Sequence, residues 1–229
     1  MHTIKILYTY YEPISYIKKT TQYSQMELIS ICQASWHRFG WQLKILGEKE
    51  ASSHPYYEEY KSIISDLPSV NPGQYDYHCF MRWLAMAQIG GGVMIDYDVM
   101  NLGITDIDFF DNIGLTIYQG HVPCVVSGSS DDYTHTAMKF GMLKNDMSCR
   151  QLIGDTYHAS DMVMLASKKI NFNSLNIVTD YPNHGKLVHC SHAACGKIGK
   201  SKIEIMKNFL KYDFHEENKE ILSNLREDK

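Results

Sequence analysis

Hydrophobic and polar residues alternate between two periodicities in the first part of the chain. The apolar run over residues 4–8 predicts a strand, which ends before Pro13. Apolar residues recur with helical spacing over 26–35, and side chains alternate over 41–46, which predicts a helix followed by a second strand. A strand, a helix and a strand in this order predict a right-handed parallel βαβ unit.

The most informative pattern covers residues 80–98. Apolar residues with helical spacing lead into three glycines at 90–92, an apolar run at 93–95, and then Asp96 and Asp98. This pattern predicts a helix, a turn and a buried strand that ends in two carboxylates. Ligands of α/β folds bind at the carboxyl ends of strands, and carboxylate oxygens suit Mg²⁺ or Mn²⁺. The sequence therefore predicts a metal site here.

The other segments predict shorter elements. Asn71 and Pro72 have the residue types of a helix N-cap and first helical position, which opens the helix over the following residues. The remaining expected elements are a helix and loop over 48–70, strands over 114–118 and 122–127, a turn at 128–132, helices over 132–145 and 148–167, strands over 175–178 and 186–190, and an amphipathic helix over 201–229. No linker or repeat interrupts them, so we expect a single domain over 1–229.

Composition narrows the class of protein. The chain has 229 residues, of which 44% are hydrophobic and 21% charged, as in ordinary soluble domains. The net charge of −4 argues against general electrostatic binding of nucleic acid. No run approaches the length of about 18 apolar residues that a transmembrane helix needs. Six cysteines without Cys-x-x-Cys spacing fit reduced thiols, so we expect a cytoplasmic protein without a transmembrane segment.

Two segments together resemble a known family. Arg82, the Gly90–Gly91 turn, the apolar run 93–95 and the pair Asp96 and Asp98 resemble the Asp-x-Asp sugar transferases of the capsular-polysaccharide and initiating-mannosyltransferase kind. Residues 35–46, in which a helix ending in tryptophan precedes a glycine, an aromatic residue and a strand, are similar to another segment of this family. The resemblance is strong over 30–100 and faint beyond. It implies an α/β fold of the GT-A glycosyltransferase type, with a Rossmann-like mixed sheet flanked by helices.

The resemblance also implies an activity. These enzymes are hexosyltransferases that move a sugar from a nucleoside-diphosphate sugar to a saccharide or another hydroxyl acceptor, generally with retention of anomeric configuration. They use Mn²⁺ or Mg²⁺. Residues 1–100 would form the nucleotide-sugar-binding half, 101–202 the acceptor half with a closing loop, and 203–229 a C-terminal helix. The implied partners are a nucleotide-sugar donor and a saccharide or glycoconjugate acceptor.

Roles follow for the residues of the central motif. Asp98 would coordinate the metal, and Asp96 would contact the ribose or share the metal. Arg82 would hold a sugar or phosphate oxygen, although a buried ion pair that staples its helix to the strand is the simpler alternative. Members of the family usually carry an aspartate three residues before this arginine. Here that residue is Cys79, and Asp76 lies one turn earlier as a substitute.

Further donor contacts are expected at the end of the first strand. Tyr8, Thr9 and Tyr10 would lie under the nucleobase, with Tyr10 or Tyr11 stacking on it, unless these are ordinary strand-end aromatic residues. Gly91 of the glycine turn is also expected to contact the donor.

The last third of the chain resembles the closing part of GT-A enzymes. His189, or else His192, would complete the metal site at a strand end. A glycine-containing loop then follows, from which Lys197, Lys200 or Lys202 would cap the diphosphate. Between these motifs, Ser160 or Asp161 is most simply a helix N-cap. In the functional interpretation, Asp161 borders the acceptor and orients its hydroxyl or acts as a catalytic base.

Two other functions remain open at this point. A haloacid-dehalogenase-like phosphohydrolase also places Asp-x-Asp after an apolar strand, but it usually has the pair near its N-terminus, whereas a βαβ unit precedes it here. A non-catalytic sugar-nucleotide-binding protein is the second alternative, and Cys79 in place of an aspartate is its one hint.

Overall fold

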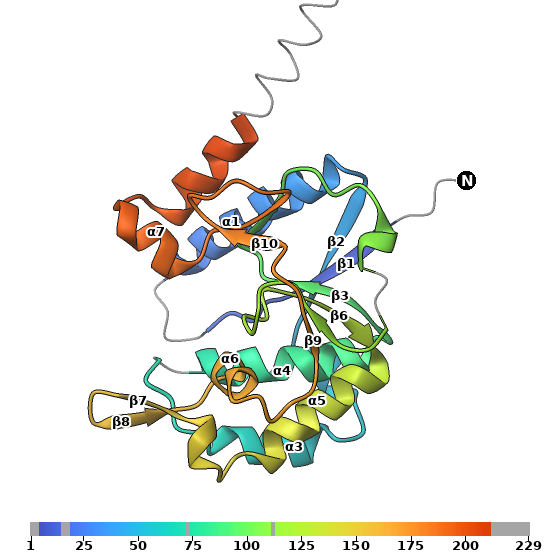
Figure 1. Ribbon diagram of the computed structural model, residues 1–229, viewed down its shortest axis with the longest axis vertical. Coiled ribbons are helices and arrows are strands. Elements are labelled where there is room, and N and C mark those ends of the chain that lie inside the picture. The colour runs from blue at the N-terminus through green and yellow to red at the C-terminus, as the bar shows by residue number, and fades with distance from the viewer. Residues whose placement is uncertain (1–4, 15–18, 72–73, 111–112, 212–229) are drawn as a thin grey trace, which may run out of the picture.

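A central mixed sheet with helices on both faces forms the body of the protein (Figure 1). The computed structural model describes residues 5–14, 19–71, 74–110 and 113–211. Helices α1 and α7 cover one face of the sheet, and α3, α4, α5 and α6 lie on the other (Figure 1). The predicted fold class, a mixed α/β sheet flanked by helices, is confirmed.

The main sheet has the strand order β2-β1-β3-β6-β5-β9. Its strands are β1 (Lys5–Tyr10), β2 (Trp41–Leu46), β3 (Gly91–Ile95), β5 (Thr116–Ile117), β6 (Val125–Ser129) and β9 (Asn173–Ser174). Strand β1 is parallel to both β2 and β3, while β6 is antiparallel to β3. The predicted parallel βαβ unit is confirmed. Because β1 and β3 are parallel neighbours, their carboxyl ends lie at the same edge of the sheet.

A second, smaller sheet positions part of the candidate site. It consists of β10 (Val178–Asp180), β11 (Leu187–His189) and β4 (Val99–Asn101). Strand β11 is antiparallel to β4, and His189 pairs with Val99. This register places His189 beside the residues that follow β3. Strands β7 (Gln151–Ile153) and β8 (Thr156–His158) form a separate hairpin.

The helices connect these strands. They are α1 (Lys19–His37), α2 (Glu48–Ser52), α3 (Tyr57–Ser65), α4 (Tyr75–Gln88), α5 (Ser130–Met142), α6 (Asp161–Ala166) and α7 (His192–Ile198), with the 3₁₀ helices η1 (Ile107–Phe110) and η2 (Met147–Cys149) and a helix over 202–211. Among the described residues, none of these helices combines the length and apolar character needed to cross a bilayer.

Two hydrophobic clusters pack on the two faces of the sheet. In β3, Met94 joins the cluster beneath α4 and α5, whereas Val93 and Ile95 join the cluster beneath α1. Both faces of this strand are therefore buried, which explains why its sequence is continuously apolar instead of alternating. In the second cluster Trp36 and Trp41 pack edge to face, with ring centroids 5.6 Å apart.

The expected helix over 148–167 is wrong. The segment contains η2, the β7–β8 hairpin and the short α6. Gly154 takes φ +59° in the hairpin turn, and Leu152 and Ile153 are exposed, so the apolar spacing does not mark a face turned toward the core. The predicted cap at the start of α6 is confirmed, since the Ser160 side chain accepts a hydrogen bond from Val163 N.

Other element boundaries also differ from the sequence predictions, or extend past the described residues. Residues 48–70 form two helices instead of one, because residues 53–56 turn between α2 and α3. Helix α4 is capped by Gln74, not by Asn71, whose amide hydrogen-bonds to Asp76 instead. The predicted C-terminal helix is present over 202–211, and residues 212–229 lie outside the described part of the chain.

Candidate metal and donor site

A tight turn between β3 and β4 presents the two aspartates of the Asp-x-Asp motif. Asp96 N donates a hydrogen bond to Cys124 O at 2.8 Å, and Val99 N donates to Asp96 O at 3.0 Å. These bonds fix the backbone at the point where the strand leaves the main sheet and enters the smaller one. Asp98 is only 8% exposed, so its carboxylate lies inside the protein and not on the rim.

His189 reaches the same place through the smaller sheet. Cys190 N donates to Asp98 O at 2.9 Å, and His189 Nε2 lies 3.5 Å from Asp98 Oδ1. One potential ligand atom from each of Asp96, Asp98 and His189 lies within 4.8 Å of the others. Among the described residues this is the group with metal-binding composition, and it does not include His192, which is exposed on α7.

The second nitrogen of His189 is held by a residue that the sequence did not reveal. His189 Nδ1 lies 2.8 Å from Gln119 Oε1, which is an acceptor, so Nδ1 carries a proton and Nε2 faces Asp98. The Cys124 thiol donates to the same oxygen at 2.8 Å. Burial disfavours the charged imidazole, but Asp98 outweighs this effect and raises the pKa of His189 to about 11. Gln119 is therefore an anchor for the ring.

The carboxylate of Asp98 is suited to bind a cation. Its Oδ2 accepts from Lys202 Nζ at 2.5 Å, while its buried Oδ1 has no hydrogen-bond partner among the described residues. Burial alone would raise the pKa of Asp98, but His189 and Lys202 hold it well below its usual range. An ionised carboxylate whose Oδ1 makes no hydrogen bond and faces the His189 imidazole, beside a second carboxylate, fits Mn²⁺ or Mg²⁺.

Arg82 links the Asp-x-Asp strand to α6. The guanidinium is 8% exposed; its Nη1 bonds to Asp96 Oδ1, and its Nε and Nη2 donate to Asp161 Oδ2 at 3.1 and 2.7 Å. The buried ion pair considered as the simpler role of Arg82 is therefore present. A contact between Arg82 and a donor sugar or phosphate stays a prediction.

The first half of the chain matches a family of protein domains. Residues 1–118, which are more than half of the chain, match the family described as a domain of unknown function, DUF8765. The chain belongs to the DUF8765 family. The matched region holds Arg82, Asp96 and Asp98, whereas Asp161 and His189 lie beyond it.

Beyond this family, a likeness to a known protein is found in three-dimensional structure. No curated protein sequence matches the chain significantly. The crystal structure of a glycosyltransferase involved in the glycosylation of the major capsid of PBCV-1 aligns with 90% of this chain and 99% of that chain, with 10% identity and a TM-score of 0.46.

Both carboxylate oxygens of Asp161 already accept hydrogen bonds from protein groups. Its Oδ2 accepts from Arg82 and from Trp83 Nε1 at 3.0 Å, and its Oδ1 accepts from Met162 N at 2.7 Å. The residue is 3% exposed. A catalytic base or an acceptor contact needs an accessible oxygen, so this geometry argues against the expected roles. Asp161 is placed to position Arg82, and through it Asp96.

The end of β1 carries polar groups without protein partners. Thr9 Oγ1 and Tyr10 OH are both buried, and neither has a hydrogen-bond partner among the described residues. Burial raises the pKa of the Tyr10 phenol, which therefore keeps its proton. Beside them, the rings of Tyr11 and Tyr97 meet edge to face with centroids 6.3 Å apart. The end of β1 thus carries buried hydroxyl groups without hydrogen-bond partners among the described residues, and aromatic rings stand beside it.

Gly91 and Tyr8 are two further residues that were expected to contact the donor. Gly91 is at the start of β3, five residues from Asp96, which is roughly 17 Å along an extended strand. Glycine is needed there because a Cβ would lie 2.5 Å from Gly128 O, with φ at +83°. Gly91 therefore shapes the far end of the strand, and its expected donor contact is corrected. Tyr8 pairs with Met94 and its ring lies over Gly92, so its expected donor contact stays a prediction.

Asp76 and Lys197 are also not directed to the carboxylate pair. Asp76 is buried, and its carboxylate accepts from Ser69 Oγ and from Asn71 Nδ2, which ties the preceding loop to α4. Lys197 is exposed on α7. Of the lysines expected to cap a diphosphate, Lys202 is the one that contacts the site.

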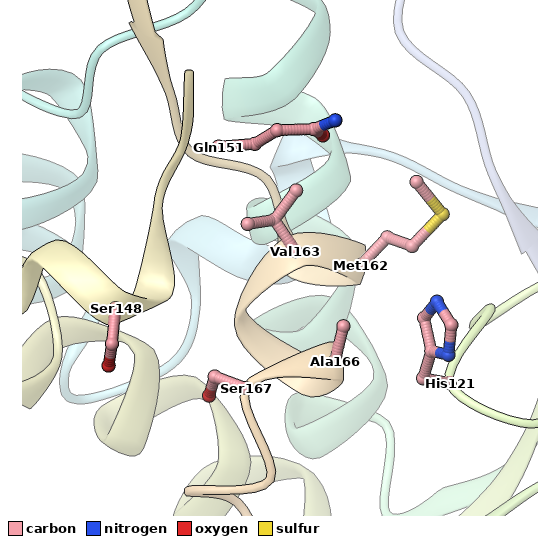
Figure 2. A pocket seen from close by; sticks show the side chains of 7 residues that line it. All are labelled: His121, Ser148, Gln151, Met162, Val163, Ala166 and Ser167. Atoms are coloured by element: carbon pink, nitrogen blue, oxygen red, sulfur yellow. The ribbon is translucent and has the colours of Figure 1, made fainter.

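A hollow of about 280 Å³ lies beside α6 (Figure 2). In Figure 2 the side chains of His121 and Met162 approach each other on one side, and Val163 and Gln151 lie on another. Met162 follows Asp161, and His121 lies two residues after Gln119. The hollow therefore adjoins the segments that anchor both Arg82 and His189, and its lining combines apolar side chains with hydroxyl, amide and imidazole groups.

Proposed function

We propose that this protein is a metal-dependent glycosyltransferase of the GT-A type that uses a nucleoside-diphosphate sugar as donor. The observation that carries the proposal is the group of Asp96, Asp98 and His189 at the carboxyl end of β3. The sequence resemblance around Arg82 and the Asp-x-Asp motif supports the same function. Bound Mn²⁺ or Mg²⁺ would supply the positive charge that stabilises a leaving diphosphate.

The protein groups would share this task as follows. Asp98, Asp96 and His189 would hold the ion, with Gln119 keeping the proton on His189 Nδ1 so that Nε2 is the ligand atom. Arg82, fixed by Asp161, orients Asp96 and provides a buried positive charge next to it. Preorganised charges of this kind need no rearrangement during the reaction.

The nucleotide would bind at the end of β1. Thr9 Oγ1 and Tyr10 OH supply unpaired polar groups, and Tyr11 and Tyr97 supply rings on which a base can stack. A nucleotide at this edge would have its phosphates next to Asp96, because β1 and β3 end side by side.

The acceptor would enter from the hollow beside α6, whose hydroxyl, amide and imidazole groups can form hydrogen bonds with a saccharide. We expect retention, with transfer on the face of the leaving phosphate. The saturated carboxylate of Asp161 agrees with a reaction that needs no protein nucleophile there. An NMR assignment of the product anomer tests this outcome, and an inverted configuration would contradict it.

The deciding experiment combines Mn²⁺ with a panel of nucleotide sugars. We expect donor hydrolysis or sugar transfer by the unmodified protein, and its loss in Asp98→Asn. Asp155→Asn, which changes an exposed aspartate in the β7–β8 turn, is the matched control and should keep full activity. Release of inorganic phosphate from phosphate esters, without turnover of any nucleotide sugar, would contradict the proposal and favour a phosphohydrolase. Nucleotide-sugar binding without turnover would favour a non-catalytic binding protein.

A further inference from the structure

The ammonium group of Lys202 lies beside Asp98, where a bound metal ion would also lie. Its Nζ lies 2.5 Å from Asp98 Oδ2, and the side chains of Lys202 and Asp98 are 10% and 12% exposed. Arg82 is paired in the same way with Asp96. Each carboxylate of the Asp-x-Asp motif therefore already has a cationic side chain as its partner.

The fold keeps Lys202 in this place at a cost. Lys202 begins the helix over 202–211, next to Ser201, whose hydroxyl accepts from Glu204 N at 3.1 Å. A positive charge at a helix N-terminus is unfavourable, and so is a buried ammonium group. Buried Ile205 and Met206 fix the helix against the second hydrophobic cluster. The negative charge of Asp98 offsets this cost, because it pairs with the buried ammonium group of Lys202.

The other oxygen of Asp98 indicates that this pairing is incomplete. Oδ1 is buried without a hydrogen-bond partner among the described residues, and it forms an ion pair with His189, whose Nε2 lies 3.5 Å away. Lys202 thus neutralises the carboxylate but leaves part of its ligand capacity unused. A divalent ion that also took Oδ2 would have to release the ammonium group, and a buried ammonium without an anion is strongly unfavourable.

We infer that Lys202 is a resident counter-ion of Asp98, and that it makes the site select a metal–nucleoside-diphosphate complex over the free metal ion. This inference rests on the proposed function. The flexible four-carbon stem of lysine lets the ammonium move from Asp98 to a phosphate oxygen without movement of the helix. Lys202 keeps an anionic partner only when the diphosphate arrives with the metal. Metal and diphosphate therefore strengthen each other's binding by the same factor.

The test measures Mn²⁺ affinity from the EPR signal of free Mn²⁺, without nucleotide and with GDP or UDP. In the unmodified protein, nucleotide should strengthen Mn²⁺ binding about tenfold or more, within the usual range of coupling between sites. Lys202→Met should bind Mn²⁺ alone about tenfold more tightly and lose most of this coupling. Lys202→Gln should behave in the same way, which guards against misfolding of one variant.

Two controls isolate the charge of Lys202. Lys44→Met removes an exposed lysine of β2 and should leave Mn²⁺ affinity and coupling unchanged. Lys202→Arg keeps the positive charge and should match the unmodified protein. Equal Mn²⁺ affinities in Lys202→Met, Lys202→Gln and the unmodified protein would overturn the inference, while donor turnover that depends on Asp98 would leave the proposed function standing. Absence of Mn²⁺ binding in every protein, with or without nucleotide, would overturn both.

Discussion

The start of α6 and the turn after β3 each bury a carboxylate beside a cationic side chain, but they satisfy it differently. Asp161, at the start of α6, accepts four hydrogen bonds from Arg82, Trp83 and the backbone of Met162. Asp98, after β3, has one oxygen bonded to Lys202 and the other without a hydrogen bond among the described residues. Since the burial of the two groups is similar, burial alone does not distinguish their roles.

The difference is informative because an unpaired buried acceptor is costly. Such a group loses about 1–3 kcal/mol compared with a satisfied one, so a fold retains it where a ligand completes it. The saturated carboxylate of Asp161 contributes to stability and positioning instead. Substitutions at the two residues should therefore separate stability from function.

The largest expected effect is a loss of stability in Asp161→Ala. Removal of this carboxylate leaves Arg82 buried with one of its two partners lost, and breaking a buried ion pair costs about 3–5 kcal/mol. Urea unfolding followed by circular dichroism measures the change. The control is Asp155→Ala in the hairpin turn, which should change the free energy of unfolding by less than about 0.5 kcal/mol. A well-folded Asp161→Ala protein of unchanged stability, but without activity, would restore the catalytic role expected from the sequence.

The next effect is on catalysis. Asp98→Asn keeps the size of the side chain but removes the negative charge that would hold the metal. We expect donor turnover to fall by about 10²–10³, the usual cost of losing one electrostatic contact in a transition state. The fold should remain, because the carboxamide oxygen of Asn has the place of a carboxylate oxygen and can still accept a hydrogen bond from Lys202. Initial rates at saturating Mn²⁺ and donor measure the effect, and turnover equal to that of the unmodified protein would exclude Asp98 from the metal site.

A smaller effect is expected at Gln119. The variant Gln119→Ala removes the acceptor that fixes His189 Nδ1, and loss of such an outer partner typically weakens metal binding about 10–100-fold. Titration of Mn²⁺ in the presence of GDP or UDP measures it. Gln42→Ala, on an exposed position of β2, is the matched control. Equal Mn²⁺ affinity in the two variants would show that His189 does not need this anchor.

The same comparison shows which parts the sequence could predict. Strands β1, β2 and β3 and helix α4 follow from local periodicity, because each buries a regular set of apolar side chains. The aspartates that end β3 were found for the same reason. The segment 148–167 failed because its apolar residues Leu152 and Ile153 are exposed, so their spacing does not report a core-facing helix.

Contacts between segments that are distant in the sequence do not follow from local patterns. His189 is positioned by the register of β11 on β4, and Asp161 meets Arg82 across 79 residues of sequence. The resemblance to a known family predicted that His189 lies beside the Asp-x-Asp pair, as it does. Asp161, which was expected to border the acceptor, is instead bonded to Arg82. No local sequence pattern marks Gln119, because it is related to His189 by a hydrogen bond between segments that are far apart in the sequence.

The smallest expected effect separates a tyrosine hydroxyl that is expected to contact the nucleotide from one that stabilises the fold. Tyr10 OH is buried without a hydrogen-bond partner among the described residues, whereas Tyr133 OH lies 3.1 Å from both Gly92 O and Val126 O, which share its one proton. Tyr10→Phe should therefore keep or slightly raise the free energy of unfolding, and Tyr133→Phe should lower it by about 0.5–1.5 kcal/mol. If the Tyr10 hydroxyl contacts the nucleotide, Tyr10→Phe should weaken GDP or UDP binding a few-fold, as measured by calorimetry with Mn²⁺ present. Tyr133→Phe should leave nucleotide affinity unchanged, because its hydroxyl is already used by the backbone. Equal nucleotide affinities in both variants would place the nucleotide away from the end of β1, even if the metal site itself is correct.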